Sequence, residues 1–237
     1  MNRILVLLVC FLASGIQSSC SQQDENDINV EIFDIYPADD IEISTHTSWT
    51  SNHYPTRIEE FKKNRLSFGD IVFLGNSITE QGGSWRDLLS IRNAKNRGIA
   101  GDTTEGVLAR LGELFYFKTD KVFILIGIND LFHPSMTPEL IAENIIEIVN
   151  QIHQYSPNTE VFVQSVLPTT TESLIDTIIT LNTNLENSQS QHPYQFINLH
   201  QHFVLENGKM DMTFSYDGVH LNDSGYQVWV DLIQNKL

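Results

Sequence analysis

The chain has 237 residues, of which 41% are hydrophobic, and it carries a formal net charge of −16. This length suits one domain of ordinary size with an additional segment at one end, and the hydrophobic content is sufficient for a buried core. The negative charge argues against nonspecific binding to nucleic acid. Contacts with phosphate groups require a basic face, and the sequence contains no basic cluster that would supply one.

The N-terminal residues 1–20 have the organisation of a signal peptide. Arg3 supplies the positive charge, and the apolar run 4–13 is too short for a membrane span of roughly 20 residues. The two cysteines of the chain are Cys10, inside this apolar run, and Cys20. Because Cys10 is removed with the signal peptide, we expect no disulfide within the mature chain.

Two interpretations of Cys20 compete. It is either an incidental residue near a secretory cleavage site, close to Gly15, or the lipidated first residue of a mature bacterial lipoprotein. The segment "IQSSC" is a loose lipobox because Gln17 stands where leucine is usual, and "SQQDEN" after it is similar to the acidic tag of bacterial surface lipoproteins. We expect an exported outer-membrane lipoprotein, on the cell surface or the periplasmic side, attached to the membrane only through Cys20. Otherwise the protein is secreted or periplasmic.

Residues 21–53 are expected to form an acidic, partly disordered tether. The stretch from Ser21 to about Ser51 contains no Lys or Arg and few apolar residues, so that most of it is solvated and only some of it packs on the domain. A helical pattern begins in "YPTRIEEFKKNR". We therefore place the folded domain at 54–237.

Strands and helices alternate from residue 54 onward. Short, mostly apolar runs predict strands at 71–74, 121–126, 160–167 and 194–199, and a weaker pattern predicts one more strand at 93–99. Apolar residues at three- and four-residue steps predict helices at 84–89, 104–114, 138–155, 174–185 and 225–233. The helix 138–155 has the strongest pattern, with Thr137 as its cap and Pro138 in its first turn.

Apolar strands separated by helices imply a parallel sheet that is covered on both faces. Five such strands fit the flavodoxin-like order 2-1-3-4-5, in a three-layer α/β/α sandwich. In this order the first three strands are neighbours, and ligands bind at their carboxyl ends. We therefore expect the loops 75–77, 100–102 and 127–130 to converge.

The loop 75–77 allows three interpretations of Ser77. The sequence "SITE" fits a capping box, in which Ser77 caps a helix and Glu80 reciprocates. Ser77, Thr79 and the helix N-terminus could instead bind a phosphate, as in an FMN site. Ser77 could also be a nucleophile. A P-loop is excluded because G-x-x-x-x-G-K-[ST] is missing, and the G-x-S-x-G elbow fails because Thr79 replaces its second glycine.

The segment "DGVHLN" places Asp217 three residues before His220. A serine nucleophile needs a base that accepts its proton and a group that orients this base. One tight turn at Gly218 would bring the two side chains together. The alternative is a surface loop with an incidental histidine.

Acyl transfer also requires donors that stabilise the oxyanion of the tetrahedral intermediate. The candidates are the backbone N–H groups of Ser77 and Gly101 and the side-chain amide of Asn129. Structural alternatives exist for each loop. Gly101 and Asn129 could only turn the chain, and Asp102 with Glu105 could form a capping box.

Four short blocks resemble those of the SGNH hydrolases, also called GDSL esterases: "GNSIT", "GIAGDT", "GIND" and "DGVH". They occur in family order and span most of the predicted domain. The resemblance implies a flavodoxin-like fold and ester hydrolysis through an acyl-enzyme. It implies Ser77 as nucleophile, His220 as base and Asp217 as its orienting residue. Ser77, Gly101 and Asn129 would be the oxyanion donors.

Asn76 departs from this family pattern, because the name-giving motif has Asp before the serine. Residue 76 takes no direct chemical step, so we expect activity to be retained. The departure points away from the best-known lipase branch. The sequence is most similar to the branch around platelet-activating factor acetylhydrolase subunits and bacterial carbohydrate acetylesterases, where short acyl groups are typical.

Three loops beyond the strand ends are expected to determine specificity: 81–85, 131–133 and 168–171. Phe132, His133 and Thr169 are the candidate substrate-binding residues. Because the loops are short and mostly polar, without a long apolar insertion, we expect a small acyl group, acetyl, on a polar carrier such as a sugar. The alternatives are a lysophospholipase or thioesterase that uses the same residues, and a non-catalytic ligand- or FMN-binding domain.

Three histidines raise the question of a metal site: His133, His200 and His202. His200 and His202 would point to one side if the last strand ran on through them, but neither a carboxylate set nor a third histidine is evident nearby. We expect neither a metal nor a cofactor. The expected partner is a small-molecule or glycan ester, and not nucleic acid.

Overall fold

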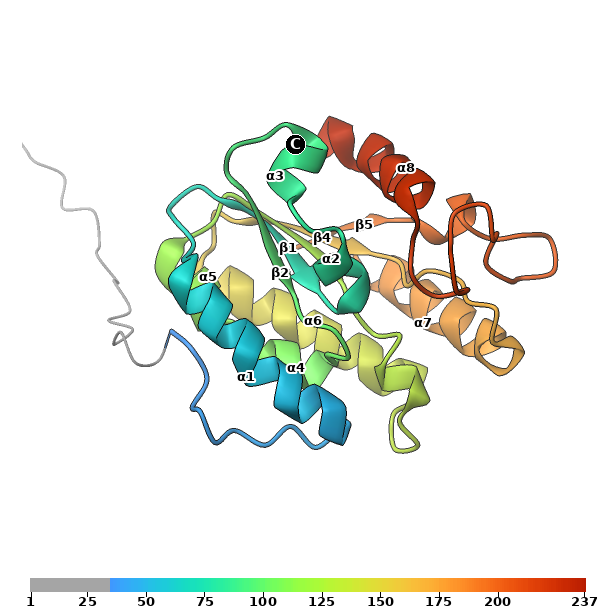
Figure 1. Cartoon of the computed structure of the whole chain (residues 1–237), viewed down its shortest axis with the longest axis horizontal. Coiled ribbons are helices and arrows are strands. Elements are labelled where there is room, and N and C mark those ends of the chain that lie inside the picture. Colours follow the sequence, from blue (N-terminus) through green and yellow to red (C-terminus); the bar gives the residue numbers. More distant parts are fainter. Residues whose placement is uncertain (1–34) are drawn as a thin grey trace, which may run out of the picture.

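The computed structural model describes residues 35–237 (Figure 1). The predicted signal peptide, Cys20 and the first part of the predicted tether lie outside these residues. No helix in the described part of the chain is both long enough and apolar enough to cross a membrane.

The centre of the fold is a parallel sheet of five strands in the order β2-β1-β3-β4-β5. The strands are β1 (Ile71–Gly75), β2 (Ala94–Gly98), β3 (Lys121–Leu125), β4 (Glu160–Gln164) and β5 (Gln195–Ile197). Every residue of β1 is buried, as expected for a strand whose sheet is covered on both faces. The predicted strand order is confirmed.

Helices cover both faces of this sheet. They are α1 (Ser48–Lys63), α2 (Ser77–Gln81), α3 (Trp85–Leu89), α4 (Thr104–Leu108), α5 (Gly112–Phe117), α6 (Pro138–Tyr155), α7 (Ile175–Ser188) and α8 (Asp223–Ile233). Figure 1 shows α3 and α8 on one side of the sheet and α1, α4, α6 and α7 on the other. The predicted three-layer α/β/α sandwich is therefore confirmed.

The predicted helix 104–114 is divided into α4 and α5. It contains Gly106 and Gly112, and glycine lowers the helix propensity of a segment. The N-cap of α4 is Thr103, whose side chain accepts from the N–H of Gly106. The capping box considered for Asp102 and Glu105 is therefore wrong, and the Asp102 side chain has other partners.

Part of the predicted tether packs against the domain. Ile35 is buried, and the Tyr36 hydroxyl donates to Glu113 Oε1 at 3.0 Å. Helix α1 begins at Ser48, before the domain start expected at Tyr54. The acidic composition of this stretch indicated solvation, but its few apolar side chains are enough to attach it to the folded domain.

The last strand ends earlier than the sequence suggested. β5 stops at Ile197, and a 3₁₀ turn, η4 (His200–His202), follows it. The two histidines of this turn therefore do not lie on one face of a strand. Within residues 35–237, no group of three or more His, Cys, Asp and Glu side chains is placed to hold a metal ion.

Candidate active site

The loops that follow β1, β2 and β3 meet at one edge of the sheet. β1 pairs with both neighbours, so that Gly75 lies opposite Gly98 on one side and Leu125 on the other. The loops after these residues contribute Ser77, Gly101 and Asn129 to a single cleft of about 390 Å³, which His220 also lines. The predicted convergence of these loops is confirmed.

Ser77, His220 and Asp217 form one hydrogen-bonded chain. Nε2 of His220 lies 2.9 Å from Oγ of Ser77, and Nδ1 of His220 lies 2.7 Å from Oδ2 of Asp217. In this arrangement the imidazole can accept the serine proton while the carboxylate orients the ring. The structure therefore brings together the three residues that the sequence suggested as nucleophile, base and orienting group.

A tight turn holds Asp217 beside His220. The backbone N–H groups of Val219 and His220 both donate to Oδ1 of Asp217, at 2.9 and 2.8 Å. Gly218 has φ of +87°, and a Cβ there would collide with the side chain of Thr170. Glycine is therefore required both for the backbone conformation and for the close approach of the neighbouring loop.

Hydrogen bonding keeps the Asp217 carboxyl ionised. Burial acts to raise its pKa, but donors from the His220 ring and from the backbone N–H groups of His220 and Val219 outweigh burial and lower the pKa below its ordinary value. Asp217 is therefore negatively charged at neutral pH. A carboxylate in this position stabilises the imidazolium that forms when His220 accepts a proton.

Ser77 is not the N-cap of the helix that follows β1. α2 begins at Ser77 itself, and its N-cap is Asn76, whose Oδ1 accepts from the N–H of Ile78 at 3.0 Å. Glu80 does not reciprocate, because its carboxylate accepts from the backbone N–H of Ala100. The capping-box interpretation of Ser77 is therefore wrong, because the N-cap lies one residue earlier, at Asn76. Since Asn76 caps the helix, the Ser77 hydroxyl can face His220.

Gly101 and Asn129, the residues suggested as oxyanion donors, line the same cleft as Ser77. Gly101 has φ of +79°, and a Cβ there would collide with the Thr50 side chain. Nδ2 of Asn129 donates to the backbone carbonyl oxygen of Asp102 at 2.8 Å. This bond orients the amide and uses one of its two N–H groups, which leaves the second to stabilise an oxyanion.

A buried ionic cluster lies behind the loop that carries Gly101. The Asp102 carboxylate is fully buried and lies 2.9 Å from both the Arg110 guanidinium and Nε2 of His46. A buried carboxylate is tolerated only when it is paired in this way. Sequence reasoning missed His46 and Arg110, because neither belongs to one of the four blocks.

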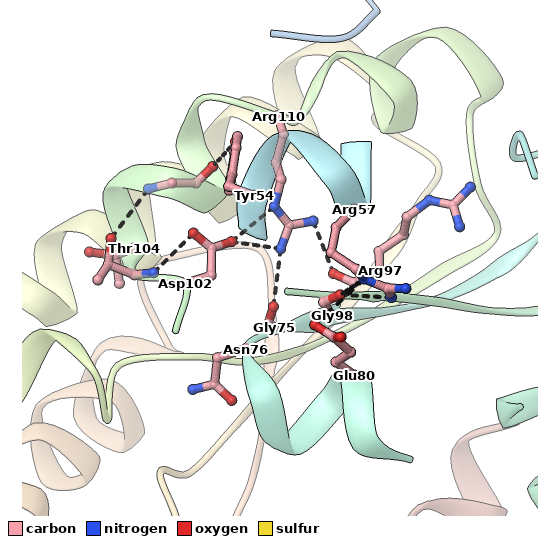
Figure 2. Close-up of polar contacts among 12 residues, drawn as sticks. Tyr54, Arg57, Gly75, Asn76, Glu80, Arg97, Gly98, Asp102, Thr104 and Arg110 are labelled. Carbon is pink, nitrogen blue, oxygen red and sulfur yellow. Dashed lines mark hydrogen bonds and ion pairs between the residues drawn. The ribbon is translucent and has the colours of Figure 1, made fainter. Parts of the chain in front are cut away.

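Arg110 connects the first two strands to this cluster. Figure 2 shows its guanidinium between Asp102 and the carbonyl oxygen of Gly75, to which it donates at 3.1 Å. It also donates to the carbonyl oxygen of Arg97 in β2, at 2.9 Å. Because Gly75 lies two residues before Ser77, one side chain ties the nucleophile loop to the oxyanion loop.

The predicted substrate-binding residues separate in the structure. Phe132 is exposed and lines the cleft. His133 and Thr169 do not line it: Nδ1 of His133 lies 2.8 Å from the Ser135 hydroxyl, and Thr169 is buried and accepts from the N–H of Thr171. Of the three predicted substrate-binding residues, only Phe132, the last residue of the 3₁₀ turn η2 (Asp130–Phe132), lines the cleft.

Two cleft residues come from other parts of the chain. Gln81 lies in the predicted specificity loop 81–85, although Trp85 at the end of that loop is in the core and stacks on Phe73. Trp49 comes from α1 and is exposed. Nothing in the sequence indicated that Trp49 lines the cleft, because it lies in the stretch whose composition predicted a tether.

Comparisons with known proteins agree with this geometry. Residues 73–228 match the model of the GDSL-like lipase/acylhydrolase family. Platelet-activating factor acetylhydrolase IB subunit alpha1 from Bos taurus is 31% identical over 165 residues, which cover 66% of this chain and 70% of that protein.

Solved structures share the fold. A GDSL-like lipase from Bacteroides thetaiotaomicron superposes with a TM-score of 0.69 at 24% identity, covering 77% of this chain and 96% of that one. An acetyl xylan esterase superposes with a TM-score of 0.59 at 17% identity, covering 71% of this chain and 99% of that one. The region matched by the family model contains Ser77, Gly101, Asn129, Asp217 and His220. The chain belongs to the GDSL-like lipase/acylhydrolase family and is a carboxylic ester hydrolase.

Proposed function

We propose that this protein is a serine esterase that removes short acyl groups, foremost acetyl, from a carbohydrate through an acyl-enzyme. The observation that carries the proposal is the hydrogen-bonded chain from Asp217 through His220 to Ser77. It opens on a cleft that also presents Gly101 and Asn129. The set supplies a nucleophile, a base, an orienting carboxylate and oxyanion donors in one place.

In the first half of the reaction, Oγ of Ser77 attacks the ester carbonyl carbon while Nε2 of His220 accepts its proton. The carbonyl oxygen becomes an oxyanion, which the N–H groups of Ser77 and Gly101 and the second amide N–H of Asn129 stabilise. His220 then donates its proton to the leaving oxygen of the sugar. The sugar hydroxyl departs, and the acyl group remains on Ser77 as an ester.

In the second half, water replaces the sugar. His220 accepts a proton from the water molecule as its oxygen attacks the acyl carbon of the Ser77 ester, and the same donors stabilise the second oxyanion. The proton returns from His220 to Oγ of Ser77, and the carboxylic acid leaves. Asp217 remains ionised in both halves and stabilises the imidazolium.

The acyl group is inferred from the size of the loops and from the relatives. The loops around the cleft are short, and the curated relative at 31% identity is, by its name, an acetylhydrolase. Both favour a small acyl group over a long chain.

A carbohydrate carrier is inferred from the walls of the cleft. The rings of Trp49 and Phe132 line it and are 59% and 57% exposed. Tyr216 lies against His220, with ring centroids 5.9 Å apart and an interplanar angle of 12°, and its hydroxyl donates to Gln81. Flat apolar rings next to hydrogen-bonding groups suit the C–H faces and hydroxyl groups of a sugar ring.

A lysophospholipase or thioesterase activity is the second candidate, because exposed apolar rings would also accept an acyl chain. The first experiment is therefore hydrolysis of p-nitrophenyl acetate, butyrate and octanoate, and of acetylated xylan, by the purified protein. We expect acetate to be the best of the three chain lengths, acetate release from the xylan, and loss of both in Ser77→Ala. A rise in turnover with chain length would favour the second candidate, and a flavin-loaded protein without esterase activity would favour a binding domain.

The sugar-binding role of Trp49 has its own test. Replacing Trp49 by Ala should lower kcat/KM for acetylated xylan about two- to tenfold more than for p-nitrophenyl acetate, because stacking on one ring contributes about 0.5–1.5 kcal/mol. Phe68→Ala is the matched control, since Phe68 is also exposed but contacts Phe117 instead of the cleft. Equal losses on the two substrates would argue against a sugar at this ring.

A further inference from the structure

Asp102 couples the two oxyanion donors that lie outside the nucleophile loop. It directly follows Gly101, and its backbone carbonyl oxygen accepts the hydrogen bond from Nδ2 of Asn129 at 2.8 Å. A displacement of Asp102 would therefore move the Gly101 N–H and the Asn129 amide together. The position of Asp102 therefore determines where both donors lie.

The two carboxylate oxygens of Asp102 are held from opposite directions. Oδ2 accepts from Arg110, which its own bonds to backbone carbonyls keep in place. Oδ1 accepts from the N–H of Thr103 at 3.0 Å and lies 2.9 Å from Nε2 of His46. Because a carboxylate accepts but does not donate, Nε2 of His46 carries the proton of this bond.

His46 reaches this site from outside the family-matched region, which begins at residue 73. Its side chain is almost fully buried, and its ring centroid lies 5.1 Å from that of Tyr54. The hydroxyl of Thr45 lies 2.6 Å from that of Thr103. Thr50 lies so close to Gly101 that no Cβ fits between them. Residues 45–50 therefore form a clamp over the oxyanion loop.

We infer that His46 is a positioning residue for the oxyanion hole, so that residues 45–50 belong to the catalytic apparatus. Oxyanion donors act only when they lie about 2.7–3.1 Å from the position of the developing charge. Without the His46 bond, Oδ1 of Asp102 would keep only the Thr103 N–H, and the carboxylate could turn toward Arg110. This role rests on the proposed function, in which Gly101 and Asn129 stabilise an oxyanion.

The test compares substitutions of His46 in steady-state hydrolysis of p-nitrophenyl acetate. His46→Ala should lower kcat about 10- to 100-fold and change KM less than about twofold, because the donors act on the transition state and not on the bound ester. His46→Gln can place an amide N–H near the position of Nε2 and should recover most of kcat. His46→Asn is too short to reach Oδ1 of Asp102 and should behave as His46→Ala does.

A second anchor of the same N-terminal segment provides the control. Tyr36→Phe removes the hydrogen bond from the Tyr36 hydroxyl to Glu113, which does not touch Asp102. We expect this variant to lower the melting temperature and to keep the wild-type kcat. Comparing Tyr36→Phe with His46→Ala therefore distinguishes a loss of attachment of the N-terminal segment from a loss of positioning of the oxyanion donors.

Each outcome of the series is decisive. Wild-type kcat in His46→Ala, or equal kcat in His46→Gln and His46→Asn, would overturn the role of His46. The comparison of His46→Gln with His46→Asn tests this role even where the His46→Ala variant does not fold. Wild-type protein that hydrolyses no ester would overturn the proposed function and this role with it. Ester hydrolysis that Ser77→Ala abolishes, combined with unchanged kcat in all His46 variants, would overturn only the role of His46.

Discussion

The two sides of the Ser77 hydroxyl are built in different ways. On the proton-transfer side, Asp217 and His220 lie three residues apart, and their side chains are 41% and 24% exposed. On the oxyanion side, Asp102 and His46 are separated by 56 residues, and their side chains are 0% and 2% exposed.

The difference follows from what each side has to do. A turn with its own backbone hydrogen bonds is enough to orient His220, so an exposed loop can carry it. In the proposed mechanism, the oxyanion donors must stay in place while negative charge develops in front of them, which requires a rigid site that solvent does not screen. Substitutions on the first side should therefore remove activity without affecting folding, and substitutions on the second side should affect both.

The largest expected effect is that of Ser77→Ala or His220→Ala. Either change should lower kcat roughly 10⁵- to 10⁶-fold, since members of such a triad act as a unit. The melting temperature should change little, because neither side chain holds the core together. Kinetics with p-nitrophenyl acetate and thermal unfolding would measure both quantities. A lower melting temperature with unchanged turnover would mean that Ser77 has a structural role.

The sharpest test of the comparison is a pair of matched substitutions, Asp217→Asn and Asp102→Asn. Asp217→Asn should lower kcat roughly 10⁴-fold at nearly unchanged stability. Asp102→Asn leaves the buried guanidinium of Arg110 without a negatively charged partner and should cost about 3–5 kcal/mol of unfolding free energy in addition to activity. Urea unfolding of both variants would measure the difference. The comparison would fail if Asp217→Asn were the less stable protein.

Asn129→Ala tests the oxyanion side directly. Loss of one donor should lower kcat roughly 10²- to 10³-fold. It should also destabilise the fold by about 1 kcal/mol, because the bond to the Asp102 carbonyl is lost. Asn198→Ala, which removes an amide after the end of β5 outside the cleft, is the control for a general effect of the substitution. Equal kcat in the two variants would remove Asn129 from the set of donors.

The last prediction concerns Asp130, which follows Asn129. Its carboxyl is buried and accepts from the N–H and hydroxyl of Thr104, and burial raises its pKa from 3.8 to about 6. The folded protein therefore binds this proton more tightly than the unfolded chain does. The resulting stabilisation is complete below pH 3.8 and is lost as the pH rises through about 6.

The free energy of unfolding of wild type and Asp130→Asn, measured between pH 4 and pH 8 in steps of roughly one unit, would show this linkage. Relative to the variant, wild type should lose up to about 3 kcal/mol across this range, at about 1.4 kcal/mol for each pKa unit. A constant difference between the two proteins would mean that the pKa of Asp130 is not raised.

Local patterns in the sequence determined the sheet and the proton-transfer side. Apolar runs of strand length separated by helices predicted the strand order, and Thr137, Pro138 and the isoleucine spacing predicted α6 at its observed bounds. Asp217 and His220 could be paired because one short turn connects them. In each case the interacting residues are neighbours along the chain or follow a regular period.

Only the tertiary structure decided which residues support the predicted oxyanion donors and which of the candidate residues line the cleft. His46 and Trp49 lie in a stretch whose acidic composition indicated a solvated tether, because composition counts charges but does not show which side chains become buried. His46 meets Asp102 across 56 residues, and no period or spacing encodes that contact. Likewise, Asn76 rather than Ser77 caps α2 because the chain enters the helix one residue earlier than the capping pattern implies. Contacts between distant segments depend on how the whole chain packs, and this packing places the clamp over the oxyanion loop.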